Sequence, residues 1–135
     1  MIAKKVVRTL MTPNQSIPVI PGVFHLTYVL NPGAAFGLFA QRTNYFIAVS
    51  VVVIALILLF GNRLARGNRV LQAGFGLMLG GAVGNLVDRV VAGKVTDFMD
   101  FRIWPVFNVA DASIVIGVGL FALDAFFGKD SRGQR

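Results

Sequence analysis

Two aspartates, Asp97 and Asp111, are the residues of this chain whose type and spacing are best suited to chemistry. Each lies at the end of an apolar stretch that could cross a membrane, and only residues 98–110 separate them. A charge at or near hydrocarbon is energetically costly, so ionisable residues in that setting are candidates for function. The short connection therefore predicts a pair of carboxylates at one face of a membrane.

A close pair of carboxylates is suited to hydrolysis by an activated water molecule. Two such groups cannot both ionise easily, so the pKa of one rises and the pair can hold one proton near neutral pH. The ionised acid takes a proton from the attacking water, and the protonated acid hydrogen-bonds the carbonyl oxygen. Which aspartate starts in which state stays open. The chain has no Cys and a single His, so water is the expected nucleophile, with no cofactor and no metal ion.

The composition is typical of a membrane protein. Hydrophobic residues make up 56% of the chain and charged residues 14%, against about 25% charged in soluble domains. The length predicts a single domain, residues 1–135. The net charge of +7 would suit a nucleic acid, but the basic residues flank apolar stretches and form no stripe with interleaved aromatics. We therefore expect no nucleic-acid partner.

Three apolar stretches predict transmembrane helices at about residues 44–60, 70–92 and 107–127. The connection 61–69 and the tail 128–135 are rich in Lys and Arg, and the positive-inside rule assigns such segments to the cytoplasm. The segment 93–106 then lies outside, together with Asp97 and the start of the third helix.

Residues 22–30 alternate between apolar and polar side chains, which predicts a half-buried strand. Residues 94–103 alternate more weakly and could pair with it. An open sheet edge cannot lie in hydrocarbon, so we expect this sheet at the outer interface, within an extracytoplasmic, strand-rich segment 1–43. The predicted fold is a mainly α membrane protein with three transmembrane helices and a small β-sheet at the outer face.

The second apolar stretch combines small and polar residues. Gly76, Gly80 and Gly84 recur every four residues, a pattern that favours close helix packing. Asn85, Asp88 and Arg89 share one helix face, where Arg89 could neutralise Asp88 or a neighbouring carboxylate. A structural polar network and a direct role in the site are equally open, and a network would still fix the geometry of the site.

Three motifs occur in order along the chain: Asn31-Pro-Gly-Ala-Ala-Phe-Gly37, Gly84-Asn-Leu-Val-Asp-Arg89 followed by Val95-Thr-Asp-Phe98, and Phe107-Asn-Val-Ala-Asp111. Together they resemble the lipoprotein signal peptidases (signal peptidase II), bacterial inner-membrane aspartic proteases. The resemblance implies that Asp97 and Asp111 are the catalytic dyad. It further implies residues that bind substrate or support the site, namely Asn31, Gly33, Ala34, Ala35, Phe36, Asn85, Asp88, Arg89 and Asn108.

The resemblance also implies the substrate and the location. The substrate would be a prolipoprotein whose signal-peptide helix precedes a diacylglyceryl-modified Cys, cut on the N-terminal side of that Cys. Acyl chains partition into lipid at about 0.8 kcal/mol per buried CH₂, which would hold the scissile bond at the interface. We expect a multi-pass, monomeric protein of the bacterial inner membrane that contacts lipid and has its active site at the extracytoplasmic face.

The N-terminus departs from the family pattern. Members have four spans, and the first carries an Asp in a D-x-x-(S/T)-K pattern, whereas this chain begins about where that span would end. The family's first helix is thus expected to be missing, which leaves two alternatives: a start assigned too far downstream, or a shortened and inactive form.

A different class of function is a non-catalytic membrane protein, such as a transporter subunit or assembly factor, with a polar Asp/Arg relay. A relay needs polar residues at several depths of the membrane. Here they cluster near one face, and residues 70–79 offer only Gln72. This distribution favours the peptidase.

Overall fold

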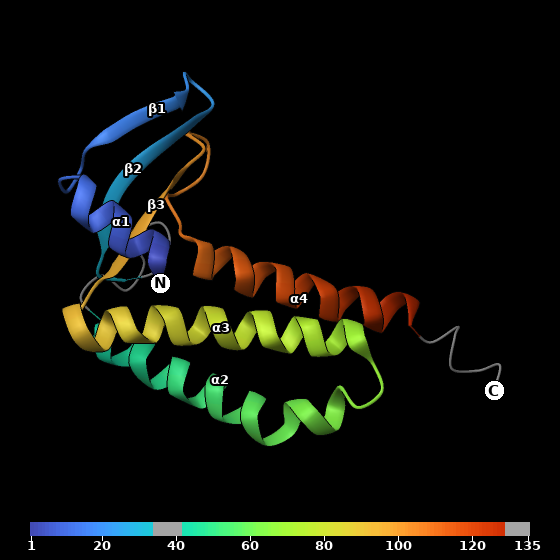
Figure 1. Ribbon diagram of the computed structural model, residues 1–135. Coiled ribbons are helices and arrows are strands. Elements are labelled where there is room, and N and C mark those ends of the chain that lie inside the picture. The colour runs from blue at the N-terminus through green and yellow to red at the C-terminus, as the bar shows by residue number, and fades with distance from the viewer. Residues whose placement is uncertain (34–41, 129–135) are drawn as a thin grey trace.

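Three long apolar helices form the body of the molecule, which a computed structural model describes over residues 1–33 and 42–128. They are α2 (Thr43–Leu64), α3 (Arg69–Ala92) and α4 (Val109–Phe127). Each is long and apolar enough to cross a membrane, and α3 lies between the other two (Figure 1). The three predicted helices are confirmed, although α2 continues past its predicted end and α4 begins two residues later than predicted.

Glycines allow α3 and α4 to pack closely, and of the three predicted ones only Gly84 lies in this contact, where a methyl group would be 3.5 Å from Ala110. A methyl group at Gly117 would lie 2.6 Å from the carbonyl oxygen of Gly74, and one at Gly81 would collide with the carbonyl oxygen of Ala110. By contrast, a methyl group at Gly76 or Gly80 would meet no atom of the described residues within 4 Å. The prediction that Gly76 and Gly80 mediate close packing is therefore wrong for this part of the chain.

A three-stranded antiparallel sheet stands at one end of the helices (Figure 1). Its strands, in the order β1-β2-β3, are Ser16–Ile20, Phe24–Asn31 and Val95–Asp100. The predicted pairing of the second and third strands is confirmed: Val29 lies opposite Asp97, and Asn31 lies opposite Val95. Strand β1 was not predicted and pairs with the far edge of β2.

A left-handed turn connects the helices to the sheet. Gly93 ends α3 with φ of 68°, a conformation that costs glycine little and other residues more. The chain enters β3 almost at once, so Asp97 on β3 stays close to the last turns of α3. The hydroxyl of Thr43, at the start of α2, donates to the carbonyl oxygen of Gly93 at 2.9 Å and fixes this turn.

Helix α1 (Ile2–Leu10) packs against the sheet and was not anticipated from the sequence. Its buried residues Lys4 and Val7 recur at helical spacing, and Met11 directly after the helix continues the face. Val7 and Met11 form the core of the sheet end together with Tyr28 and Phe98. The consequence for the site is that α1 brings two basic side chains, Lys4 and Arg8, against the end of α3.

Candidate active site

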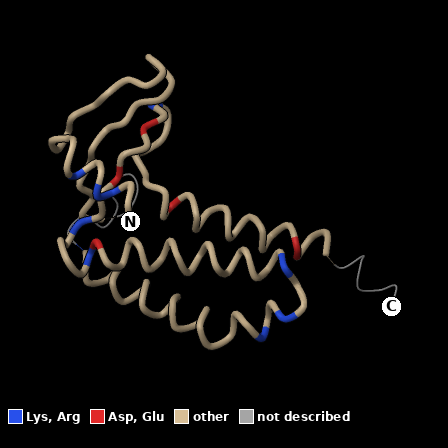
Figure 2. Tube along the Cα trace, viewed as in Figure 1, with Lys and Arg blue, Asp and Glu red and all other residues tan. Residues whose placement is uncertain are grey.

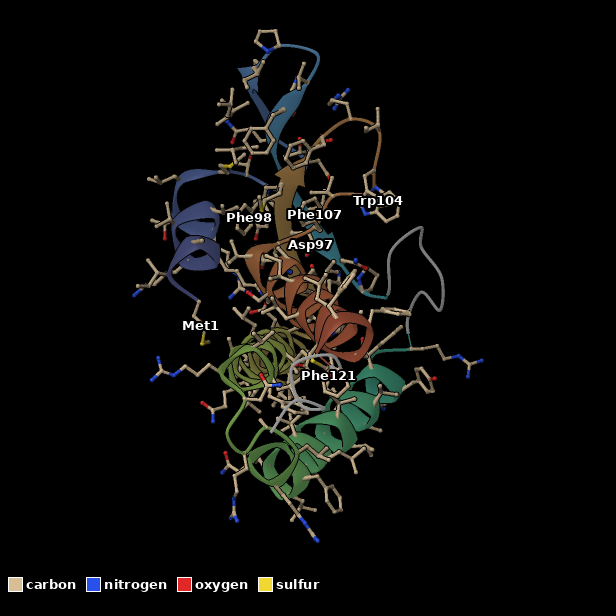
Figure 3. The ribbon with its side chains drawn as sticks, turned by 90° about the vertical axis from the view of Figure 1, so that its right-hand side faces the viewer. Met1, Asp97, Phe98, Trp104, Phe107 and Phe121 are labelled. Carbon is tan, nitrogen blue, oxygen red and sulfur yellow. The ribbon has the colours of Figure 1, made fainter. Side chains whose placement is uncertain are left out.

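Asp97 and Asp111 lie on the wall of the same pocket, as their spacing predicted. Asp97 belongs to β3 and is 2% exposed, and Asp111 belongs to the first turn of α4. The pocket has a volume of about 310 Å³ and is also lined by Asn31, Gly33 and Arg89. Figure 3 shows Asp97 next to the first turns of α4, with Phe107 and Trp104 nearby.

The local sequence fixes where α4 begins and how Asp111 is oriented. The side-chain oxygen of Asn108 accepts the backbone N–H groups of Ala110 and Asp111, at 2.7 and 3.2 Å. In return, Oδ2 of Asp111 accepts the backbone N–H of Asn108 at 3.0 Å. This reciprocal capping box satisfies donors that the first turn would otherwise leave unpaired. One carboxylate oxygen of Asp111 is thus used locally, and Oδ1 is directed to the site.

Three asparagine side chains donate hydrogen bonds to the two carboxylates. Nδ2 of Asn108 donates to Oδ1 of Asp97 at 2.7 Å, and Nδ2 of Asn31 donates to Oδ2 of Asp97 at 3.0 Å. Nδ2 of Asn85 donates to Oδ1 of Asp111 at 2.7 Å. The donors come from β2, α3 and the residue before α4, so the site depends on the complete fold.

Each of these amides has its oxygen occupied elsewhere. Oδ1 of Asn108 caps α4, Oδ1 of Asn31 accepts the backbone N–H of Gly33 at 2.9 Å, and Oδ1 of Asn85 accepts Nδ2 of Asn108 at 3.1 Å. An amide oxygen that already accepts a donor leaves the amino group for the other partner. Both acids therefore accept hydrogen bonds from neutral amides, and each amide is held in one orientation by the contact of its oxygen.

The electrostatics of the pocket favour a protonated carboxyl group. Burial raises the pKa of Asp97 to about 6, and the negative charge of Asp111 acts in the same direction. The hydrogen bonds from Asn108 and Asn31 oppose the rise but do not cancel it. Asp97 can consequently hold a proton much closer to neutral pH than an ordinary aspartate. Such a pair can deliver one proton and accept another, which is the requirement for general acid and base catalysis.

Comparisons with known proteins identify the family. The sequence model of the family described as Signal peptidase (SPase) II matches residues 1–127. The chain belongs to the signal peptidase II family.

Individual relatives give the same result. The lipoprotein signal peptidase of Moorella thermoacetica is 53% identical over 117 residues, which are 87% of this chain and 78% of the relative. That of Brevibacillus brevis is 46% identical over 125 residues, 90% of this chain and 84% of the relative. A solved structure, described as a bacterial membrane enzyme structure by the in meso method at 2.3 Å resolution, superimposes with a TM-score of 0.87 at 32% identity, covering 99% of this chain and 83% of the other.

The resemblance predicted from three motifs is thereby confirmed. The chain is an aspartic-type membrane peptidase of the family that removes signal peptides from prolipoproteins. Nothing in the comparisons favours the alternative of a non-catalytic membrane protein with an Asp/Arg relay.

Asp88 and Arg89 of the peptidase have different surroundings, although both were predicted to bind substrate or support the site. Asp88 is 3% exposed and forms ion pairs with Lys4 and Arg8, each at 2.8 Å. The backbone N–H of Thr96 donates to it at 3.0 Å. Asp88 is thus neutralised by α1 rather than by Arg89, and it supports the site from outside the pocket.

Arg89 lines the pocket that contains the two acids. Its guanidinium donates to the carbonyl oxygen of Gly33 at 3.3 Å and lies 5.0 Å from the centre of the Phe46 ring. Gly33 is thereby fixed at the edge of the pocket. The other predicted residues of this segment, Ala34, Ala35 and Phe36, lie outside the described residues.

The sequence analysis missed Lys4, Arg8 and Thr96. Arg8 Nε donates to the hydroxyl of Thr96 at 2.7 Å, so α1 is attached to both α3 and β3. The helical spacing of Lys4, Val7 and Met11 was the available signal, because it marks a lysine on an otherwise apolar face. As for metals, residues 1–33 and 42–128 contain no group of three or more His, Cys, Asp or Glu side chains arranged to bind an ion.

Proposed function

We propose that Asp97 and Asp111 are the catalytic dyad of this peptidase and that they activate a water molecule. The observation that carries the proposal is that both acids line one pocket and are held by neutral amide donors. No cation pairs directly with either acid in the described part of the chain, so the pair keeps its capacity to exchange a proton. Buried acids with raised pKa values in a pocket are typical of catalytic sites.

The reaction follows from this arrangement. The pair shares one proton at rest, and burial favours Asp97 as its holder. Asp111 then acts as the base that takes a proton from water while the water oxygen attacks the scissile carbonyl carbon. Asp97 donates its proton to the carbonyl oxygen in the tetrahedral intermediate. When the C–N bond breaks, the proton taken by Asp111 passes to the leaving amine, and Asp97 recovers the proton from the intermediate's hydroxyl.

The orientation in the membrane is a second part of the proposal. Arg63, Arg66 and Arg69 lie around the α2–α3 connection, at the end of the helices away from the sheet (Figure 2). Because basic residues favour the cytoplasmic side, the sheet and the dyad would face the outside, as expected for cleavage of exported proteins.

An apolar groove next to the dyad supports a lipid-borne substrate. It has a volume of about 550 Å³ and begins at Asp111. Its remaining lining is apolar, and its members are Phe101, Ile103, Trp104, Phe107, Ala112, Val115 and Ile116. Because the exposed side chains of α4 are apolar, for example Val115 and Ile116, acyl chains could enter this groove from the bilayer without crossing water. We propose that the diacylglyceryl group of a prolipoprotein lies here and that the monomeric peptidase cuts on the N-terminal side of the modified Cys.

Asparagine substitutions test the dyad. Asp97→Asn and Asp111→Asn keep the shape of each side chain and remove the acid, so each should abolish cleavage of a lipidated prolipoprotein while the protein remains inserted. Asp124→Asn, at the opposite end of α4, is the matched control and should cleave normally. Product mass should place the cut before the lipidated Cys. Near-normal turnover in either dyad variant would show that the dyad is assigned wrongly.

Cysteine labelling tests the orientation, because the native chain has no Cys. A single Cys at Lys94, an exposed residue between α3 and β3, should react with a membrane-impermeant reagent in intact cells. A single Cys at Gln134 should react only after lysis. The reverse pattern would refute the orientation.

A further inference from the structure

Lys4 on α1 is a buried lysine with an unusual set of partners. It is 5% exposed, whereas lysine side chains are rarely buried unless they are paired. Its ammonium donates to Oδ2 of Asp88 and to Oδ1 of Asn85, both at 2.8 Å, and to the carbonyl oxygen of Gly84 at 3.4 Å. All three N–H groups are therefore used, and they meet consecutive turns of α3.

Neutralising Asp88 does not by itself account for Lys4. Arg8 already pairs with Oδ1 of Asp88 at 2.8 Å, and the backbone N–H of Thr96 donates to Oδ2 at 3.0 Å. Of the two cations, only Lys4 contacts the side-chain amide of Asn85, because Arg8 makes no hydrogen bond to it in the described residues. Lys4 is thus connected to the pocket through Asn85, and Arg8 is not.

Two contacts, one with Lys4 and one with Asn108, set which way the amide of Asn85 points. An ammonium group can only donate, so it requires the amide oxygen, and Nδ2 of Asn108 donates to the same oxygen at 3.1 Å. The amino group of Asn85 is left to donate to Asp111 at 2.7 Å. If the amide turned over, its amino group would face two donors and its oxygen would face a carboxylate.

We propose that Lys4 is a positioning residue of the active site, which fixes the direction of the Asn85 amide and so keeps a hydrogen-bond donor on Asp111. The inference rests on the proposed dyad, because the hydrogen bond to Asp111 affects turnover only if Asp111 is catalytic. Lys4 acts through Asn85 and does not touch the reacting groups.

The test is the substitution Lys4→Met, which keeps most of the length of the side chain and removes the donor. Without the ammonium, only Asn108 still donates to the Asn85 oxygen, so the amide can turn over and take a hydrogen-bond donor away from the carboxylate pair. The acidic limb of the pH profile of kcat should therefore move to higher pH, and kcat at neutral pH should fall roughly tenfold. KM should stay nearly unchanged. The matched control is Lys5→Met, an exposed lysine on the same helix, which should behave like the wild type.

A double-mutant cycle separates positioning from a purely structural role. In an Asn85→Leu background the amide is absent, so Lys4→Met should cause little further change in kcat. Lys4→Arg, which restores a charged donor, should return the acidic limb toward that of the wild type. If Lys4→Met lowers kcat by the same factor at every pH, and by the same factor again in the Asn85→Leu background, the inference is overturned.

A second variant covers the case in which Lys4→Met does not fold. Asn85→Asp keeps the partner of Lys4 but replaces the donor to Asp111 with an acceptor, so it should shift the acidic limb in the same direction. An unshifted limb in this variant would also overturn the inference. Asp97→Asn and Asp111→Asn are measured in the same assay: activity in either refutes the dyad, whereas their inactivity with a normal Lys4→Met profile refutes only the role of Lys4.

Discussion

Asp88 and Asp97 are almost equally buried, at 3% and 2% exposure, yet their partners differ in charge. Asp88 lies between two cations, Lys4 and Arg8. Asp97 is held by two neutral amides, those of Asn31 and Asn108. Full countercharges keep a buried carboxylate ionised and make it part of the framework. Neutral donors orient a carboxylate but leave it able to take up a proton. The charge of the partners, rather than burial, thus distinguishes Asp88, which we propose is structural, from Asp97, which we propose is catalytic.

The largest expected effect is on the stability of the Asp88 cluster, formed by Asp88, Lys4 and Arg8. Asp88→Asn leaves the buried Lys4 and the partly exposed Arg8 without their countercharge, and breaking a buried ion pair such as Lys4–Asp88 costs roughly 3–5 kcal/mol. The unfolding temperature in detergent should therefore fall by many degrees, as measured by differential scanning fluorimetry. Lys5→Met, an exposed neighbour on α1, is the control. An unfolding temperature equal to that of the wild type would remove the distinction between the two regions.

An intermediate effect is expected in the pH dependence of the protein's stability, and its cause is the titration of Asp97. The pKa of Asp97 is raised by burial to about 6 in the folded protein, from 3.8 in the reference state. Between these values the folded state binds a proton that the unfolded state has released, so stability should fall as pH rises from about 4 to about 6 and level off above it. The difference corresponds to roughly 3 kcal/mol.

The measurement is the unfolding temperature of the wild type and of Asp97→Asn across that pH range. The variant cannot titrate at this position, so the fall attributed to Asp97 should disappear. Parallel curves for the two proteins would show that Asp97 is ionised throughout, like an acid with cationic partners.

The smallest effect concerns Asp100, a third buried acid that sharpens the comparison. Burial acts to raise the pKa of Asp100, but hydrogen bonds from Thr27 and Arg102 outweigh it and hold the pKa below its usual value. Its ion pair with the half-exposed Arg102, at 3.0 Å, makes it resemble Asp88 rather than Asp97. Asp100→Asn should cost about 1 kcal/mol of stability and leave kcat unchanged. A large loss of kcat at constant stability would place Asp100 among the chemical acids.

Much of the fold followed from strong, local patterns in the sequence. Long apolar runs predicted α2, α3 and α4, and period-two alternation predicted the pairing of β2 with β3. Asp97 and Asp111 could be predicted because acids at the ends of apolar runs are rare and costly. Each of these signals can be read within a single element of the chain.

Other features could not be predicted because their causes are far apart in the chain. Lys4 is buried only because Asn85 and Asp88 supply its partners, more than 80 positions away. The packing glycines of α3, Gly74 and Gly81, are set by the path of α4 rather than by the four-residue repeat that Gly76 and Gly80 follow. The three amides of the site were predicted as polar residues, but the direction of each depends on what occupies its oxygen.

The central claim is that acids with neutral partners perform the chemistry and acids with cationic partners maintain the fold. The most direct measurement is the turnover of a lipidated prolipoprotein per folded molecule by Asp88→Asn, Asp97→Asn and Asp111→Asn, with unfolding temperatures recorded in parallel. We expect Asp97→Asn and Asp111→Asn to remain folded without measurable turnover, and Asp88→Asn to unfold at a much lower temperature while its folded fraction still cleaves. Turnover in a folded Asp97→Asn or Asp111→Asn variant, or a stable and inactive Asp88→Asn variant, would contradict the central claim.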